Sequence, residues 1–253
     1  MPGIYRNPES LLAAIETWLR DKLRSAGGKG GIVGLSGGID SAVVAAILKR
    51  TCGERMLAVI MPCHSHPEDR LHAELAAGHY GLPLEVVDLT STYDSLVAAL
   101  PSEDGSSTGI ARANIKPRLR MATLYFLAQE RNMLVCGTGN RVELAVGYFT
   151  KHGDSGVDLL PLGDLLKGEV RELARLLGVP PPIVEKPPSA GLWEGQTDEG
   201  EMGVSYGELD RYLANGEGPE KVRSFVEKAR LRSEHKRNTA PVCVISETSL
   251  MKR

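Results

Sequence analysis

The sequence predicts an α/β fold: a doubly wound, Rossmann-like parallel sheet flanked by helices. Short apolar runs at 31–33, 56–61, 84–88 and 133–137 alternate with helical patterns, which is the order expected of a parallel sheet. The run at 56–61 is apolar throughout, as in a strand buried on both faces. A glycine-containing motif at 34–42 follows the first run, and sheets of this kind bind ligands beyond the ends of their strands.

Composition and charge narrow the choice of partners. The 253 residues suffice for one hydrophobic core, and a net charge of −2 is unlike the basic surface of a nucleic-acid-binding protein. Neither a membrane-spanning apolar run nor a signal-peptide pattern is visible. The four cysteines are scattered without a Cys-x-x-Cys pair, which indicates reduced thiols and argues against a zinc site. We therefore expect a cytoplasmic protein that binds neither nucleic acid nor membrane.

The first predicted element is a helix over 9–25. Its apolar residues recur at the spacing of one helix face, and they are Leu11, Leu12, Ile15, Trp18, Leu19 and Leu23. Glycines between 27 and 31 then end the helix and lead into the first strand. Further helices are predicted over 67–79, 205–214 and 219–232.

The motif at 34–42 reads Gly-Leu-Ser-Gly-Gly-Ile-Asp-Ser-Ala and lies between a strand and a helix. Its glycines let backbone amides approach a ligand, and the helix start adds N–H groups with a partial positive charge. The Gly-Lys-Ser/Thr ending of the common P-loop is missing. We expect a phosphate-binding turn made by Gly34, Leu35, Ser36, Gly37, Gly38, Ile39, Asp40 and Ser41.

Asp40 brings negative charge into this predicted anion site and by itself would repel phosphate. A Mg²⁺ ion that bridges the carboxylate and the phosphate oxygens removes the conflict. The alternative is that Asp40 merely caps the helix, a position that favours Asp.

Two further strand ends lie beside this turn. Met61 ends the second strand, so we expect the loop at 61–69 to lie beside the phosphate-binding turn. Thr138 and Glu143 follow the fourth strand and should point into the same crevice. Glu143 would complete the Mg²⁺ site with Asp40, because Mg²⁺ is usually held by one or two carboxylates together with phosphate oxygens. The alternative for Glu143 is a surface salt bridge.

Several motifs resemble those of known families. The motif at 34–42 resembles the pyrophosphate-binding loop of the ATP pyrophosphatases, which adenylate a substrate and release pyrophosphate. The stretch at 114–121 (Asn-Ile-Lys-Pro-Arg-Leu-Arg-Met) is similar to a motif of the NAD synthetase family. The stretch at 148–154 resembles that family's deamido-NAD-binding segment, and 234–237 its Glu-His-Lys-Arg sequence. The resemblance to NAD synthetase extends from about residue 9 to 241.

This resemblance implies an adenine nucleotide alpha-hydrolase-like fold and a ligase that forms a C–N bond. Such an enzyme amidates deamido-NAD with ammonia, uses ATP as co-substrate together with Mg²⁺, and forms an adenylate before AMP leaves. Family members are homodimers with the dinucleotide pocket at the interface, so a homodimer is expected here as well.

The resemblance also implies the roles of individual residues. Asp40, Lys151 and Lys167 would be catalytic, with Asp40 and Glu143 holding the metal. The ATP contacts beyond the phosphate-binding turn would be Met61, Thr138, Lys167 and Ser189. The deamido-NAD contacts would be Arg118, Tyr148, Phe149, Lys151, Asp154, His235 and Lys236.

The residue types suit these roles. Tyr148 or Phe149 would stack on the pyridinium ring, and Lys151 would face a carboxylate or phosphate. Asp154 would bind ribose hydroxyls or balance the pyridinium charge. Lys167, at the start of another helix, suits the ATP phosphates.

Residues 186–203 carry too little periodicity for a helix or strand. A loop of this length in a compact domain is usually functional. An indole on a polar loop would bury no apolar surface unless the loop closed over a ligand. Because Trp193 lies in this loop, we interpret the segment as a lid that excludes water. Simple disorder is the alternative.

Glutamine-using relatives carry an additional glutaminase domain, and the sequence before Gly34 leaves no room for one. We expect residues 1–253 to form a single ATP-pyrophosphatase domain that uses free ammonia; a separate glutaminase subunit is an alternative. Two other functions remain open. A tRNA-thiolating ATP pyrophosphatase would show a basic extension and paired cysteines, and a non-catalytic adenine-nucleotide-binding module would need neither Asp40 nor the 148–154 segment.

Overall fold

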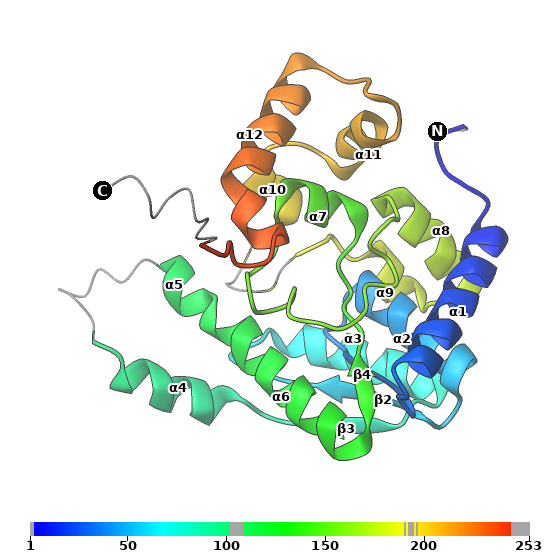
Figure 1. Cartoon of the computed structure of the whole chain (residues 1–253), viewed down its shortest axis with the longest axis vertical. Coiled ribbons are helices and arrows are strands. Elements are labelled where there is room, and N and C mark those ends of the chain that lie inside the picture. Colours follow the sequence, from blue (N-terminus) through cyan, green and yellow to red (C-terminus); the bar gives the residue numbers. More distant parts are fainter. Residues whose placement is uncertain (1–2, 102–108, 190, 192–194, 196, 244–253) are drawn as a thin grey trace, which may run out of the picture.

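The computed structural model describes residues 3–101, 109–189, 191, 195 and 197–243. In this part of the chain, parallel strands form a four-stranded sheet in the order β3-β2-β1-β4 (Figure 1). The strands are β1 (Gly30–Gly34), β2 (Met56–Ile60), β3 (Leu84–Val86) and β4 (Met133–Val135). Each overlaps one of the apolar runs, so the predicted parallel α/β sheet is confirmed.

Helices connect and follow the strands, and those predicted over 9–25, 67–79, 205–214 and 219–232 are present. The helices of the described residues are α1 (Pro8–Ser25), α2 (Ile39–Cys52), α3 (Pro67–Tyr80), α4 (Thr90–Ala99), α5 (Gly109–Ala113), α6 (Ile115–Arg131), α7 (Arg141–Val146), α8 (Lys167–Leu177), α9 (Pro181–Glu185), α10 (Asp198–Met202), α11 (Tyr206–Asn215) and α12 (Glu220–Arg237). None of them combines the length and apolar character needed to span a bilayer.

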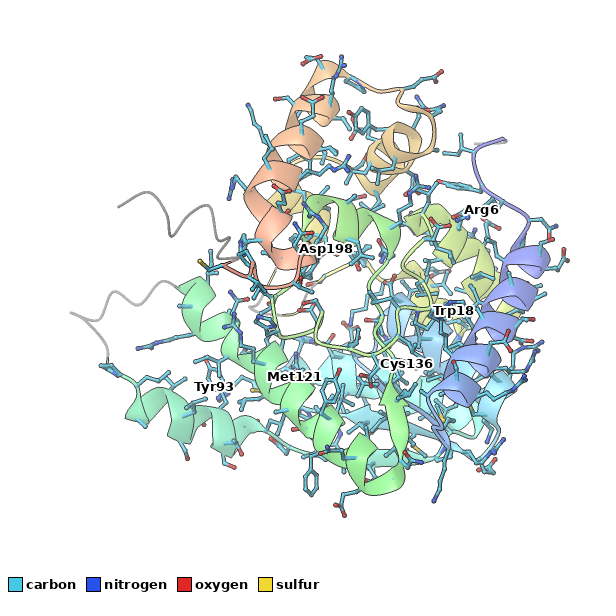
Figure 2. The ribbon with its side chains drawn as sticks, viewed as in Figure 1. Arg6, Trp18, Tyr93, Met121, Cys136 and Asp198 are labelled. Atoms are coloured by element: carbon cyan, nitrogen blue, oxygen red, sulfur yellow. The ribbon has the colours of Figure 1, made fainter. Side chains whose placement is uncertain are left out.

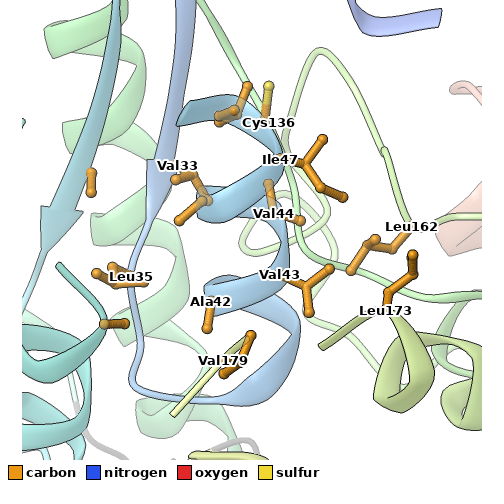
Figure 3. Packing of buried hydrophobic residues seen from close by; sticks show 14 of the residues in the cluster. Val33, Leu35, Ala42, Val43, Val44, Ile47, Cys136, Leu162, Leu173 and Val179 are labelled. Carbon is orange, nitrogen blue, oxygen red and sulfur yellow. The ribbon is translucent and has the colours of Figure 1, made fainter. Parts of the chain in front are cut away.

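The two faces of the sheet bury alternate strand residues against different helices. On one face, Val33 of β1 and Ala58 of β2 belong to a core shared with α1, α2, α3 and α8 (Figure 3). On the other face, Ile32 and Val59 belong to a core shared with Leu124 and its neighbours on α6. Helices therefore cover both faces, and the sheet is doubly wound as predicted.

A third apolar cluster lies beside the sheet and joins α7, α11 and α12. Tyr206 and Leu209 of α11 lie at its centre with Val142 of α7 and Val222 of α12, all of them buried. Figure 1 shows these helices together on the side of the molecule opposite α6 and β3. Because α11 also contacts α8, the cluster connects the C-terminal helices to the main core.

Strand pairing sets the place of the candidate site. β1 and β4 are neighbours, with Ile32 paired to Val135, so the chain leaves both strands at the same edge of the sheet. The turn after Gly34 and the segment after Cys136 therefore lie side by side, where parallel sheets usually bind ligands.

The burial of α1 predicts which of two adjacent residues stabilises the fold. Leu19 is fully buried, whereas Trp18 lies at the margin of the apolar stripe and is 37% exposed (Figure 2). Leu19→Ala should lower the free energy of unfolding by about 2–5 kcal/mol, because it leaves a cavity between α1 and its neighbours. Trp18→Ala, the matched control, should cost less. Urea unfolding of both variants checks this, and equal losses would contradict it.

Candidate active site

A pocket of about 780 Å³ opens at the edge of the sheet where β1 and β4 end. Segments that are distant in sequence line it, including the turn after β1, the loop after β2, the first residue of α8 and the end of α12. The predicted site residues that line it are Gly34, Leu35, Ser36, Gly38, Ile39, Asp40, Ser41, Met61, Thr138, Glu143, Tyr148, Phe149, Asp154, Lys167, Ser189 and Lys236.

Four predicted site residues do not line this pocket, namely Gly37, Arg118, Lys151 and His235. Gly37 shapes the turn instead: its φ is +81°, and a Cβ there would lie 2.2 Å from the backbone oxygen of Asp69. Arg118 is exposed and donates from Nε to the backbone oxygen of Lys151 at 3.3 Å. His235 is exposed on the last turn of α12.

Serine side chains hold the turn between β1 and α2. The Ser36 and Ser41 hydroxyls lie 3.1 Å apart, and the Ser41 hydroxyl donates to the backbone oxygen of Gly38 at 2.9 Å. Gly38 is the N-cap of α2 and offers no side chain to the first N–H groups of the helix. This helix start therefore faces the pocket uncapped, as an anion site requires.

The Asp40 side chain does not cap α2. Its Oδ2 lies 2.5 Å from the Nζ of Lys167, and its Oδ1 accepts a hydrogen bond of 3.1 Å from the amide of Asn140. Both partners come from other parts of the chain, so the alternative in which Asp40 is only a helix cap is wrong.

Asn140 links the two predicted metal ligands. It is fully buried and forms a capping box with Glu143 at the start of α7. The Asn140 backbone N–H donates to Oε2 of Glu143 at 3.0 Å, while its side-chain amide donates to Asp40. Our sequence analysis did not select Asn140, although the Asn-x-x-Glu spacing is a capping-box signal that predicts this contact with Glu143.

Lys167 is the buried cation of the site. It is 1% exposed, with its Nζ 2.5 Å from Asp40, 3.9 Å from Oε1 of Glu143 and 4.9 Å from the centre of the Tyr206 ring. Burial alone would lower the pKa of this ammonium, but the charges of Asp40 and Glu143 outweigh burial and raise it. Lys167 therefore remains a cation beside two carboxylates.

Glu143 and Asp198 are buried carboxyl groups whose charged form is disfavoured. Burial, followed by the charge of Asp40, raises the pKa of Glu143 to about 8. Burial also raises the pKa of Asp198, which accepts from the Tyr206 hydroxyl at 2.8 Å through Oδ2. Its Oδ1 is buried and has no hydrogen-bond partner among the described residues. Such oxygens suit a hard cation. Among the described residues, no group of three or more His, Cys, Asp or Glu forms a metal centre by itself, so phosphate or water oxygens would have to complete the shell.

Asp198, which lines the pocket, and Tyr206, whose ring contacts Lys167, were not among the predicted site residues. Asp198 begins α10 after the N-cap Thr197, within the segment for which we expected neither helix nor strand (Figure 2). That expectation is wrong for 198–202, because a five-residue helix is too short to show periodicity. Trp193, on which the lid hypothesis depended, lies outside the described residues.

The far end of the pocket is aromatic and basic. The Lys236 ammonium donates to the backbone oxygens of Gly147 and Phe149, each at 2.8 Å, and lies 5.4 Å from the centre of the Phe149 ring. The Tyr148 hydroxyl donates to Oε2 of Glu201 at 2.7 Å. Lys236 therefore reaches the pocket of its own chain, and a face of Phe149 already carries a cation.

The loop after β2 borders the turn, and two basic side chains hold it. Arg120 of α6 donates to the backbone oxygen of Met61 and to Oγ of Ser65, both at 3.1 Å. Lys186 pairs with Asp69 at 2.5 Å. The pocket thus joins an uncapped helix start, a lysine between carboxylates and an aromatic end, which together can hold a polyphosphate and an aromatic carboxylate near each other.

Comparisons with known proteins agree with this geometry. A profile described as NAD synthase matches residues 11–242. A protein of Carboxydothermus hydrogenoformans, named NH3-dependent NAD+ synthetase, is 52% identical over 93% of this chain and 98% of its own length. A solved NMN synthetase from Francisella tularensis superposes with a TM-score of 0.90 at 36% identity, covering 95% of this chain and 100% of that one. A solved NAD+ synthetase from Burkholderia pseudomallei does so with a TM-score of 0.76 at 28% identity, over 93% and 91% of the two chains. The chain belongs to the NAD synthase family.

Proposed function

We propose that this chain is an ammonia-dependent NAD+ synthetase, a ligase that amidates deamido-NAD at the expense of ATP. The observation that carries the proposal is the Lys167 ammonium buried between Asp40 and Glu143 beside the uncapped start of α2. Membership of the NAD synthase family and the name of the Carboxydothermus relative support it.

The chemistry explains why ATP is needed. A carboxylate is a poor electrophile and hydroxide a poor leaving group, so the nicotinate carboxylate first attacks the α-phosphorus of ATP. Pyrophosphate leaves, ammonia attacks the carbonyl carbon of the adenylate, and AMP departs. The protein contributes by positioning the reactants and neutralising charge.

The chain's own residues fit these tasks. Ser36, Ser41 and the backbone amides at the start of α2 bind the β- and γ-phosphates, and Lys167 neutralises charge on the phosphates that leave. Asp40 and Glu143 would hold Mg²⁺, which when bound would offset the charge of the pyrophosphate. Tyr148 and Phe149 line the same pocket and would stack on the nicotinate ring.

The Cys136 thiol of the pocket favours ligase chemistry over thiolation. Cys136 lines the pocket, and burial raises the pKa of its thiol far above the ordinary value. A protonated, buried thiol is a poor nucleophile. This argues against the tRNA-thiolating alternative, which needs reactive cysteines.

A second substrate is favoured by one comparison. The Francisella relative, named an NMN synthetase, has the higher TM-score and identity of the two solved structures described above. A mononucleotide carries the same nicotinate carboxylate as deamido-NAD and would use the same adenylation site. Deamido-NMN is therefore the second candidate acceptor.

We also propose a homodimer that uses free ammonia as a single domain. Its support is apolar surface on neighbouring elements, because Leu96 and Leu100 at the end of α4, Ile110 of α5 and Phe126 of α6 are exposed. The exposed positions of Arg118 and His235 also suit contacts to a ligand shared between subunits. A cytoplasmic location without nucleic-acid partners stays a prediction from the sequence.

Acceptor-dependent pyrophosphate release tests the function. With ATP, Mg²⁺ and ammonium, deamido-NAD should give the highest kcat/KM, with amide product and AMP formed in equal amounts by mass spectrometry. A higher kcat/KM with deamido-NMN would select the second candidate. Release that depends on tRNA, or no release with any acceptor, would contradict the proposal.

Removing the charge of Asp40 should stop catalysis and spare the fold. Asp40→Asn should lower kcat/KM about a hundredfold or more, because the metal and Lys167 both lose an anionic partner. Asp21→Asn, which changes an exposed carboxylate on α1, is the control and should be active. Wild-type turnover should also disappear with EDTA and return with Mg²⁺. An active Asp40→Asn variant of unchanged metal dependence would refute the metal role.

A charged substitution on α6 tests whether the proposed dimer forms through this surface. Phe126→Asp places a charge at a residue that is 64% exposed and should give monomers by sedimentation velocity with little loss of thermal stability. Leu231→Asp, at a position on α12 that is 75% exposed, is the control and should stay dimeric. A monomeric wild type, or a dimeric Phe126→Asp variant, would exclude this interface.

A further inference from the structure

The start of α8 is held by a carboxylate from another helix. The backbone N–H of Lys167 donates to Oδ1 of Asp210 at 2.9 Å, and that of Gly168 donates to Oδ2 at 2.8 Å. Asp210 belongs to α11 and is 1% exposed. The first N–H groups of α8 are therefore satisfied within the protein, and Lys167 faces the pocket through its side chain.

Tyr5, which precedes α1, completes this contact. Its hydroxyl donates to Oδ2 of Asp210 at 3.0 Å. Its ring lies on Gly168, where a Cβ would come within 2.1 Å of the ring carbon Cζ. Burial, followed by the charge of Asp210, raises the pKa of Tyr5 to about 12, so the hydroxyl stays protonated and remains a donor.

Arg6 forms a second anchor one residue further along. Its Nε and Nη2 each donate to Glu169 at 2.8 Å, and its Nη1 pairs with Asp164 at 2.7 Å. Glu169 is buried and also accepts from the backbone N–H of Leu166 at 2.9 Å. Figure 2 shows Arg6 in the N-terminal segment beside α8. The segment thus ties down the turn from which Lys167 projects.

Helix α11 contacts both the backbone and the ammonium group of Lys167. Tyr206 and Asp210 are four residues apart, so they lie on one face of this helix. The Tyr206 ring lies 4.9 Å from the Lys167 ammonium, while Asp210 binds the Lys167 backbone. A lysine side chain has several rotatable bonds, and fixing its backbone and its tip leaves the ammonium little freedom.

We propose that Asp210 and Tyr5 are positioning residues for Lys167, which set where its ammonium meets the phosphates of the nucleotide. The proposal rests on the function proposed above. Neither residue touches the reactants; each acts by fixing the first turn of α8. Displacements of about 1 Å in a catalytic group can cost about a hundredfold in rate, so a loosened turn should be visible in kcat.

The test uses two variants and a matched control in the full-length protein. Asp210→Asn removes one of the two acceptor oxygens, and Tyr5→Phe removes one hydroxyl but keeps the ring on Gly168. The control is Tyr80→Phe, because the Tyr80 hydroxyl donates to the backbone oxygen of Leu177 at the opposite end of the same helix. Pyrophosphate release is measured with ATP and deamido-NAD, and kcat is expressed per active site from the pyrophosphate burst.

We expect Asp210→Asn to lower kcat about tenfold and Tyr5→Phe about threefold, with the KM for ATP changed less than about twofold. Tyr80→Phe should keep the wild-type kcat. In a Lys167→Arg background, both substitutions should cause almost no further loss of kcat. A general loss of folded protein would instead lower kcat by the same factor in the wild-type and Lys167→Arg backgrounds.

An unchanged kcat in Tyr5→Phe and Asp210→Asn, or an equal fall in both backgrounds, would overturn the positioning role. If Asp210→Asn does not fold, Tyr5→Phe decides the question. Failure of the proposed function would be recognised separately, because the wild type would then release no pyrophosphate with deamido-NAD.

Discussion

The buried ion pair between Lys167 and Asp40 is the interaction around which the site is arranged. Taking two charges out of water is costly, and the cost is recovered only when both are paired and hydrogen-bonded. Asn140 supplies the additional hydrogen bond to Asp40, and Glu143 the second negative partner of Lys167. These residues come from the segment after β1, the segment after β4 and the start of α8, which only the folded sheet brings together.

The two helices that begin at this site, α2 and α8, differ in whether their first N–H groups are hydrogen-bonded within the protein. The N-cap of α2 is Gly38, and its first N–H groups remain open to the pocket. The first N–H groups of α8 are bound by Asp210. A helix start carries partial positive charge, so an open one attracts an anion and a neutralised one does not. The positive charge that α8 brings to the pocket is therefore that of the Lys167 side chain, and the helix serves to aim it.

Local signals in the sequence were enough to predict the sheet and one wall of the pocket. The strand, turn and helix around 34–42 depend on neighbouring residues, and the strand-end rule brought Glu143 to the same edge as Asp40. Tyr206, Asp198 and Asp210 could not be found in this way. The packing of α11 against α7 and α12 places Tyr206 and Asp210, and the short helix α10 places Asp198, so their positions depend on contacts between segments distant from the motif at 34–42.

The N-terminal segment was missed for a similar physical reason. Tyr5 and Arg6 lie outside any periodic pattern, and their partners on α8 and α11 are more than 150 residues away in the chain. Long-range polar contacts of this kind produce no regular spacing in the sequence from which they could be predicted. Predicted residues such as Arg118 and Lys151 show the converse: a motif assigned them a role, yet in one chain they contact each other at the rim and do not line the pocket.

Charge balance connects the ion pair to the proposed metal. Asp40, Glu143 and Asp198 surround a single ammonium, so carboxylates outnumber cations by the charge of one divalent ion. Burial, followed for Glu143 by the charge of Asp40, raises the pKa values of Glu143 and Asp198, so both carboxyl groups take up protons more readily than exposed ones. A triphosphate alone would add negative charge to this site, whereas Mg²⁺ bound with it would offset that charge. The proposed Mg²⁺ site would therefore favour a nucleotide that carries its metal over the free triphosphate.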